Sequence, residues 1–184
     1  MYLIRDYKHK IKSQKFKISF SFESLDPCFY LKPLLFLSNA AGHIRDVQDA
    51  IGEEYRISNC QGVIFNRRHD TFLLDLSRLD REIESITLVL SPPADYHFHT
   101  LTNYRVAIEG QDIESEKFWA ISSCSVAEKS SDFVMVFNLV RHTRHSGWYL
   151  QGRSRYFSGD AYSLYRLFGY QDYFPETICN LHRV

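Results

Sequence analysis

The sequence has no apolar stretch long enough to cross a membrane, which takes about 18 consecutive apolar residues or more. It also lacks the pattern of a secretory signal, because the apolar start at residues 1–4 is followed at once by charged residues and not by an apolar core. A membrane-spanning or secreted protein is therefore not predicted, and we expect a cytoplasmic location.

Neither sign of charge is in excess, since Lys plus Arg and Asp plus Glu each number 22. Without an overall positive charge, nucleic-acid binding would have to depend on a local patch. Cysteine is scarce as well, and Cys28, Cys60, Cys124 and Cys179 lie far apart without a C-x-x-C pair. This usage is typical of the reducing cytosol, so we expect buried structural thiols.

The chain shows no internal repeat, no low-complexity linker and no sign of a second domain. Its 184 residues are 45% hydrophobic and 15% aromatic, which is enough to build one core. We predict a single domain over residues 1–184, with a basic N-terminal segment at 1–14 and a C-terminal extension at 170–184. The extension is too apolar for a free tail and should pack on its own domain or on a partner.

Segments with alternating polar and apolar residues recur along the chain and indicate β-strands. The clearest is 15–23, in which Phe16, Ile18, Phe20 and Phe22 fall on one face. Further strands are predicted at 29–37, 71–76, 86–91, 102–109 and 117–122, and a helical turn at 48–55. Short strands separated by turns predict an all-β protein, namely a two-sheet antiparallel β-sandwich, with a short C-terminal α-helix.

Residues 132–169 give the strongest indication of the fold. The strand at 133–140 is apolar on both faces and should lie centrally in a buried sheet. After a polar turn at 141–147, a second strand begins at Trp148, with Trp148 and Leu150 on one face. Phe137 and Trp148 should therefore be buried on neighbouring strands.

At residues 161–168 the apolar residues recur with the spacing of an α-helix and no longer alternate as in a strand. Its predicted apolar stripe consists of Ala161, Leu164, Tyr165 and Phe168. Ser158 or Asp160 can cap the helix start, and Gly169 can supply the left-handed residue that ends it.

This order of strand, turn, strand and helix resembles the C-terminal end of the TerD-type tellurium-resistance and bacterial stress-protein family. The shared features are the strand ending in Arg141 and His142, the Gly147-Trp148 start of the next strand, and the helix ending in Gly. Upstream, residues 29–44 are similar to the family's D-L-D strand and N-G-K-V turn, and residues 71–79 to its K-V-D-L-S strand. The resemblance covers residues 15 to 170 and implies a binding or scaffold domain of a bacterial stress-response or tellurite-resistance system.

The resemblance also implies a calcium site, which in the family combines two Asp residues on one strand with a Gly- and Asp-rich loop. Tyr30 and Lys32 stand at the two Asp positions. The acidic loop is replaced by 59–70, where Asp70 is the only carboxylate and two arginines are added. We therefore expect no calcium binding of the family type and no cofactor.

Histidines provide a second candidate for metal binding, because transition metals favour imidazole ligands. His97 with His99, and His142 with His145, form two pairs without a nearby Cys or carboxylate. Surface positions in loops explain the same residues, so the sequence leaves a metal site open. It shows no motif of nucleophilic catalysis, and we expect that the protein is not an enzyme.

Lysines crowd the N-terminus and alternate with aromatic residues, a combination that suits a phosphate backbone or an anionic membrane surface. They are Lys8, Lys10, Lys12, Lys15 and Lys17. The alternative is a solvated strand whose lysines protect an exposed sheet edge.

A second basic patch, the arginine hairpin, suits phosphate or carboxylate ligands because the guanidinium group is a planar fork of donors. Its candidate binding residues are Arg141, His142, Arg144, His145, Tyr149, Arg153 and Arg155. Arg153 and Arg155 should emerge on one face of their strand, as should Tyr149 and Gln151. In a competing explanation, Asp112, Glu114 and Glu116 neutralise the cluster within the fold.

Two functions follow from these observations. The first is a non-enzymatic binding or scaffold domain whose partners are other proteins of a stress-response assembly. The alternative is a nucleic-acid or anionic-ligand binding protein that uses the lysine-rich N-terminus or the arginine hairpin. The oligomeric state and the identity of the partner are left open.

Overall fold

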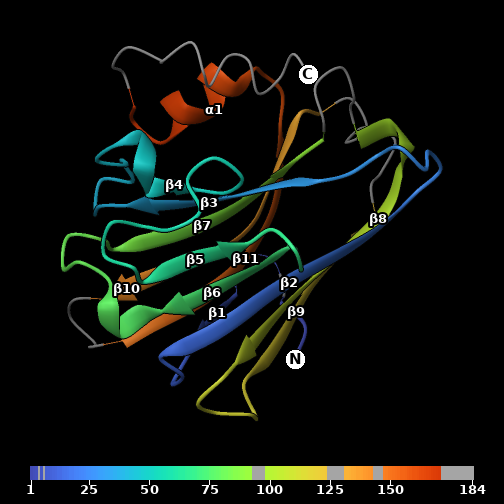
Figure 1. Ribbon diagram of the computed structural model, residues 1–184. Coiled ribbons are helices and arrows are strands. Elements are labelled where there is room, and N and C mark those ends of the chain that lie inside the picture. The colour runs from blue at the N-terminus through green and yellow to red at the C-terminus, as the bar shows by residue number, and fades with distance from the viewer. Residues whose placement is uncertain (4, 6, 93–97, 124–130, 143–146, 171–184) are drawn as a thin grey trace.

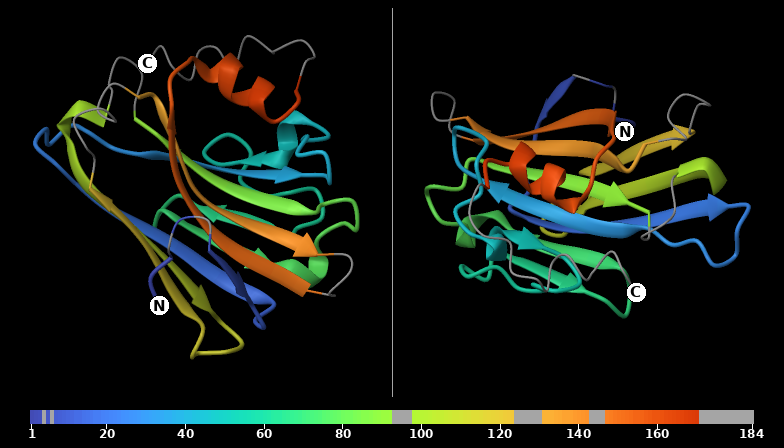
Figure 2. Two further views of the ribbon diagram at one scale, coloured as in Figure 1. Left: turned by 180° about the vertical axis from the view of Figure 1, so that it is seen from behind. Right: turned by 90° about the horizontal axis from the view of Figure 1, so that it is seen from above.

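The computed structural model describes residues 1–3, 5, 7–92, 98–123, 131–142 and 147–170. Two antiparallel sheets form the layers of a sandwich, and a short helix lies at one end beside β3 and β4 (Figure 1). Figure 2 shows the same arrangement from behind and from above. The predicted fold class, an all-β sandwich with a C-terminal helix, is confirmed.

One sheet has six strands in the order β1, β11, β10, β7, β3, β4. Their bounds are Lys8–Lys10 for β1, Gly147–Phe157 for β11, Phe133–His142 for β10, Ser85–Ser91 for β7, Lys32–Ser38 for β3 and Ala50–Ile51 for β4. The other sheet has five strands in the order β5, β6, β2, β8, β9. Their bounds are Val63–Asn66 for β5, Thr71–Asp75 for β6, Lys15–Ser24 for β2, Leu101–Gly110 for β8 and Lys117–Ser123 for β9. The α-helix α1 is Ala161–Leu167, and 3₁₀ turns lie at Val47–Asp49, Leu76–Arg78 and Phe98–Thr100.

The main core fills the space between the two sheets. Strand β2 contributes Phe16 and Ile18, which are 1% and 0% exposed, as its alternation predicts. This strand is paired on both sides, with β6 and β8, and therefore lies in the middle of its sheet.

Strand β10 is central in the six-stranded sheet, as predicted, and it contacts apolar groups on both sides. Its alternation slips once, because the register shifts between Met135 and Phe137. Val136 and Phe137 both join the main core, while Met135 packs in a second cluster under α1. A bulge at this point reverses the faces of the strand.

Helix α1 covers the second cluster on the outer face of the six-stranded sheet. The ring of Phe168 stacks on that of Phe36 with centroids 4.0 Å apart. The Asp160 side chain caps the helix start by accepting from the backbone N–H of Ser163 at 2.8 Å. Gly169, at φ +73°, follows the helix in the left-handed conformation that the sequence predicts.

Three segments differ from the sequence predictions. Strand β3 begins at Lys32 and not at residue 29. In the predicted helical turn at 48–55, a 3₁₀ turn is followed by Ala50 and Ile51, which pair with β3. Residues 59–70, expected as a loop, hold strand β5 and the start of the β5–β6 hairpin. In both of the last two cases, pairing with a neighbouring strand decides the local structure.

The expectation of buried thiols is wrong for Cys28, which is exposed. Cys60 is half-buried, and its Sγ lies 3.4 Å from the Oγ of Ser58. Cys124 and Cys179 lie outside the described residues. Among the described helices, none is long and apolar enough to span a membrane.

A candidate partner-binding face

The two basic patches of the sequence meet on the outer face of the six-stranded sheet. Strand β1 pairs with β11, so Lys8 lies opposite Gln151 and Lys10 opposite Tyr149. Cross-strand partners share a face of the sheet, and their side chains are close neighbours. Pairing therefore joins part of the lysine-rich N-terminus to part of the arginine hairpin.

We call this surface the basic face, and its members are Lys8, Lys10, His142, Tyr149 and Arg155, while Gln151 between them on β11 is buried. Lys8, Lys10 and Arg155 are exposed. These three cations have no ion pair within the part of the chain that the structure describes. The rings of His142 and Tyr149 meet nearly edge to face, with centroids 5.4 Å apart. The surface thus offers hydrated cations beside an aromatic pair.

The strict alternation expected for Arg153 and Arg155 is interrupted. Ser154 between them has φ +43°. The register of β11 against β10 shifts at this point, because Gly152 pairs with Phe137 whereas Arg155 pairs with Met135. Arg155 remains exposed, with its guanidinium 5.5 Å from the centre of the Phe157 ring. Arg153 is half-buried and its Nε is shielded from water. A bulged residue re-aims the side chains around it, so the two arginines are not equivalent.

Arg141 does not belong to the basic face. Its cross-strand partner is Trp148, a core residue, and its guanidinium lies 4.9 Å from the centre of the Trp148 ring. Its Nη1 donates to the backbone carbonyl of Arg81 at 3.1 Å. Arg141 therefore packs on a core residue and has a structural role. The candidates Arg144 and His145 lie outside the described residues.

The proposed neutralisation of the arginines by acidic residues is wrong for two of the three. Both Asp112 oxygens accept backbone N–H groups, from Gln14 at 2.9 Å and Lys15 at 3.3 Å. Glu116 likewise accepts from the backbone of residues 12 and 13, at 2.8 Å each. The hydrogen bond from Gln14 is the main reason that the pKa of Asp112 is lowered. These carboxylates hold the link between β1 and β2.

The remaining N-terminal lysines point elsewhere. Lys15 is 3.7 Å from Asp75 across the β2–β6 pair of the other sheet. Lys17 lies opposite Leu73 and Glu109 in the same sheet. The five lysines therefore do not form one patch, because the chain passes from one sheet to the other between residues 10 and 15.

The positions that the resemblance connects with calcium hold no set of ligands. The Lys32 ammonium lies 5.6 Å from the centre of the Tyr30 ring, so the two side chains share one side of the chain as expected. No group of three or more possible metal ligands occurs among the described residues. Of the other histidine candidates, His97 and the side chain of His99 lie outside the described part of the chain.

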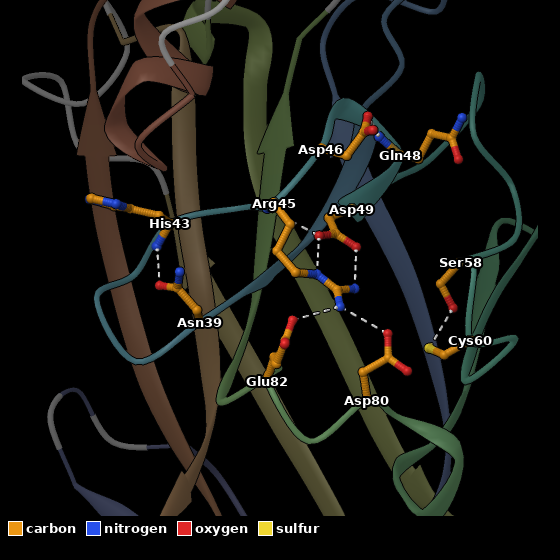
Figure 3. A network of polar contacts seen from close by, with 10 residues as sticks. All are labelled: Asn39, His43, Arg45, Asp46, Gln48, Asp49, Ser58, Cys60, Asp80 and Glu82. Atoms are coloured by element: carbon orange, nitrogen blue, oxygen red, sulfur yellow. Dashed lines mark hydrogen bonds and ion pairs between the residues drawn. The ribbon is translucent and has the colours of Figure 1, made fainter.

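A polar cluster that the sequence analysis missed surrounds Arg45 (Figure 3). Arg45 Nε and Nη2 donate to the two oxygens of buried Asp49 at 2.9 and 3.0 Å, and Nη1 donates to Asp80 at 2.9 Å. Glu82 lies 3.5 Å from the same Nη1. Hydrogen bonding to Asp49 is the largest cause of the raised pKa of Arg45. The spacing of Arg45 and Asp49 is a signal that sequence reading could have used, whereas Asp80 is 35 residues away.

Comparisons with known proteins support the fold. No profile of a known protein family and no curated protein sequence matches the chain. A crystal structure of a homologue of the telluride resistance protein TerD, from Streptomyces coelicolor A3(2), has a TM-score of 0.63 at 15% identity and covers 84% of this chain and 96% of that one. A crystal structure of a protein of unknown function has a TM-score of 0.65 at 14% identity and covers 87% of this chain and 99% of that one. The chain thus has a divergent TerD-like sandwich fold.

Proposed function

We propose that this chain is a non-enzymatic binding domain that holds an acidic protein partner on its basic face, within a bacterial stress-response or tellurite-resistance system. The observation that carries the binding role is the pairing of β1 with β11, which places Lys8 and Lys10 beside the aromatic pair on one surface. The TerD-like fold supports the choice of pathway, and the proposal includes a cytoplasmic location.

The electrostatics of the surface favour an anionic partner. Exposed cations that carry no ion pair keep their full attraction for carboxylates, and the loss of hydration on binding is smaller for Arg than for Lys. Complementary charge mainly raises the association rate and sets which partners are accepted. Tyr149 adds a half-buried aromatic group, a residue type that often anchors interfaces.

The test uses a fluorescent 20-residue polyglutamate peptide as the acidic probe and the full chain. We expect binding to be lost in Lys8→Ala/Lys10→Ala/Arg155→Ala and kept in the control Arg67→Ala/Arg68→Ala/Arg78→Ala. The control removes the same charge from exposed positions on the other sheet and its neighbouring turns. If both variants lost the same amount of peptide affinity, the attraction would be nonspecific and the basic face would not be the binding site.

The alternative function, binding of nucleic acid, draws on the same surface because Lys10 lies opposite Tyr149, whose ring contacts that of His142. Bases stack on aromatic side chains, and phosphate binding weakens steeply with salt. An oligothymidylate of 20 nucleotides distinguishes the two functions. Tighter binding of this probe than of polyglutamate, with dependence on Tyr149, would favour nucleic acid.

A further inference from the structure

A pocket lies between α1 and the outer face of the six-stranded sheet. The sheet supplies the floor through Leu34 and Phe133, and α1 supplies a wall through Ala161, Leu164 and Tyr165. These groups are largely apolar, so the interior suits a hydrophobic body. The turn that follows β4 also lines the pocket.

That turn gives the pocket a negative wall. Glu53, Glu54 and Tyr55 all line it. Glu53 is half-buried and Glu54 is exposed. Neither carboxylate has an ion pair or a hydrogen-bond donor among the described residues. The pocket thus places two carboxylates beside apolar surface, and the cation of Lys32 lies in the same lining.

The charge of Glu54 acts on the interior of the pocket. Partial loss of hydration raises the pKa of Glu54. Burial, and then the nearby charge of Glu54, raise the pKa of the Tyr165 hydroxyl. The carboxylate and this buried aromatic ring both line the pocket.

We propose that this pocket binds an organic cation with an apolar body, such as an alkylammonium or arylammonium group. Carboxylates would neutralise the ammonium at the wall of residues 53 and 54, while the rings of Tyr55, Phe133 and Tyr165 surround the rest of the ligand. A cation is attracted both to carboxylates and to aromatic faces, and an apolar body gains from burial. Lys32 at the floor disfavours a second positive charge at that end of the ligand. The site does not depend on the basic face.

The experiment titrates the full chain with phenethylammonium and, as a control of similar size and opposite charge, 3-phenylpropanoate. Calorimetry gives the affinities, and nuclear magnetic resonance shows which residues respond. We expect saturable binding of phenethylammonium, with responses confined to α1 and residues 50–55, and at least about 10-fold weaker binding of 3-phenylpropanoate, which corresponds to about 1.4 kcal/mol.

Two variants locate the site. Glu53→Gln/Glu54→Gln should weaken phenethylammonium binding by about 10-fold or more, while the exposed control Glu114→Gln should leave it unchanged. Ala161→Leu fills the pocket without leaving a cavity and should abolish binding, whereas Tyr162→Leu on the exposed side of α1 should not.

Three outcomes would overturn the proposal. They are equal binding of the two probes, unchanged affinity in the double Gln variant, and responses located away from α1. Absence of any binding of phenethylammonium to the parent protein would overturn it as well.

Discussion

At the scale of single residues, Arg45 shows how one side chain can hold distant segments together. Its planar guanidinium matches the Asp49 carboxylate with two parallel hydrogen bonds and reaches Asp80 with a third. The Asp49 side chain is 2% exposed, so its charge depends on this partner, whereas that of Arg45 is 30% exposed. Removing one member of such a pair leaves an uncompensated charge, which costs more than the pair itself contributes.

We therefore expect Arg45→Met to lower the free energy of unfolding by up to about 3 kcal/mol, the lower end of the range for buried pairs because the guanidinium is partly hydrated. Urea unfolding measures the change. Arg68→Met, at an exposed position in the β5–β6 turn, is the control and should change stability by less than about 0.5 kcal/mol. If the urea midpoint of Arg45→Met equals that of the control, water must form the hydrogen bonds to the Asp49 carboxylate that Arg45 forms in the parent.

Asp112 makes stability depend on pH in a predictable direction. Because hydrogen bonds from Gln14 and Lys15 lower its pKa in the folded state, it stabilises the fold above its unfolded pKa, about 3.9. This contribution is lost as the pH falls through the lower folded value. Asp112→Asn should be less stable than the parent at pH 7, and the difference should shrink below about pH 4.

Guanidinium unfolding at pH 7 and pH 3 tests this dependence on Asp112, with exposed Glu114→Gln as the control. A stability difference between parent and Asp112→Asn that stays constant with pH would show that the carboxylate is not the source.

At the scale of elements, the hairpin of β10 and β11 lies inside the six-stranded sheet, between β1 and β7. Its predicted core residues are confirmed, with Phe137 0% and Trp148 5% exposed. They lie on neighbouring strands but are not opposite one another, since Phe137 faces Gly152 and Trp148 faces Arg141. A glycine opposite a large ring leaves room for that ring in the core.

Phe137→Ala should lower the free energy of unfolding by about 3–5 kcal/mol, because it removes buried apolar surface and leaves a cavity. Denaturant unfolding measures the loss. Ile121→Ala, on a residue that is 49% exposed in β9, is the matched control and should cost much less. Equal effects of the two substitutions would contradict the position of Phe137 in the core.

Gly169 lies two residues after the end of helix α1, and its conformation and surroundings both require glycine. Gly169 has φ +73°, and an added Cβ would lie 2.3 Å from two ring atoms of His43. We expect Gly169→Ala to lower stability by at least about 1 kcal/mol and to lower the melting temperature. Gly42→Ala has a similar φ of +81° but open space around it, so it measures the cost of the backbone conformation alone. A smaller effect at Gly169 than at Gly42 would contradict the contact with His43.

At the scale of the whole molecule, the chain has a TerD-like fold, with Tyr30 and Lys32 at the positions that the resemblance connects with calcium. Tyr30 and Lys32 contact each other, and part of the segment that replaces the acidic loop is an edge strand of the five-stranded sheet. Within that segment, Val63 and Phe65 are buried in the main core, so part of the replaced loop contributes to the sandwich itself.

Calcium should therefore leave the melting temperature unchanged. A ligand that binds only the folded state stabilises it by about 2.7 kcal/mol at one hundred times its dissociation constant. Thermal unfolding with millimolar Ca²⁺, and with a chelator in its place, measures the difference. A rise of several degrees that the chelator removes would show that other oxygens bind the ion.

Much of the fold follows from local patterns, because the alternation of side chains depends on neighbouring residues of the same chain. Lys15 to Glu23 forms a strand for this reason, and the stripe of Leu164, Tyr165 and Phe168 forms a buried helix face. The capping role of Asp160 and the conformation of Gly169 were predictable because each depends on a few adjacent residues.

The candidate surfaces depend on contacts between distant residues, and only the tertiary structure decides those. Strand β1 meets β11 across some 140 residues of chain, which no local pattern encodes. The bulge at Ser154 changes the direction of the arginines because strand pairing tolerates one extra residue there. The sequence thus determined which segments are strands and helix, while long-range pairing determined which charges share a face and where a pocket remains.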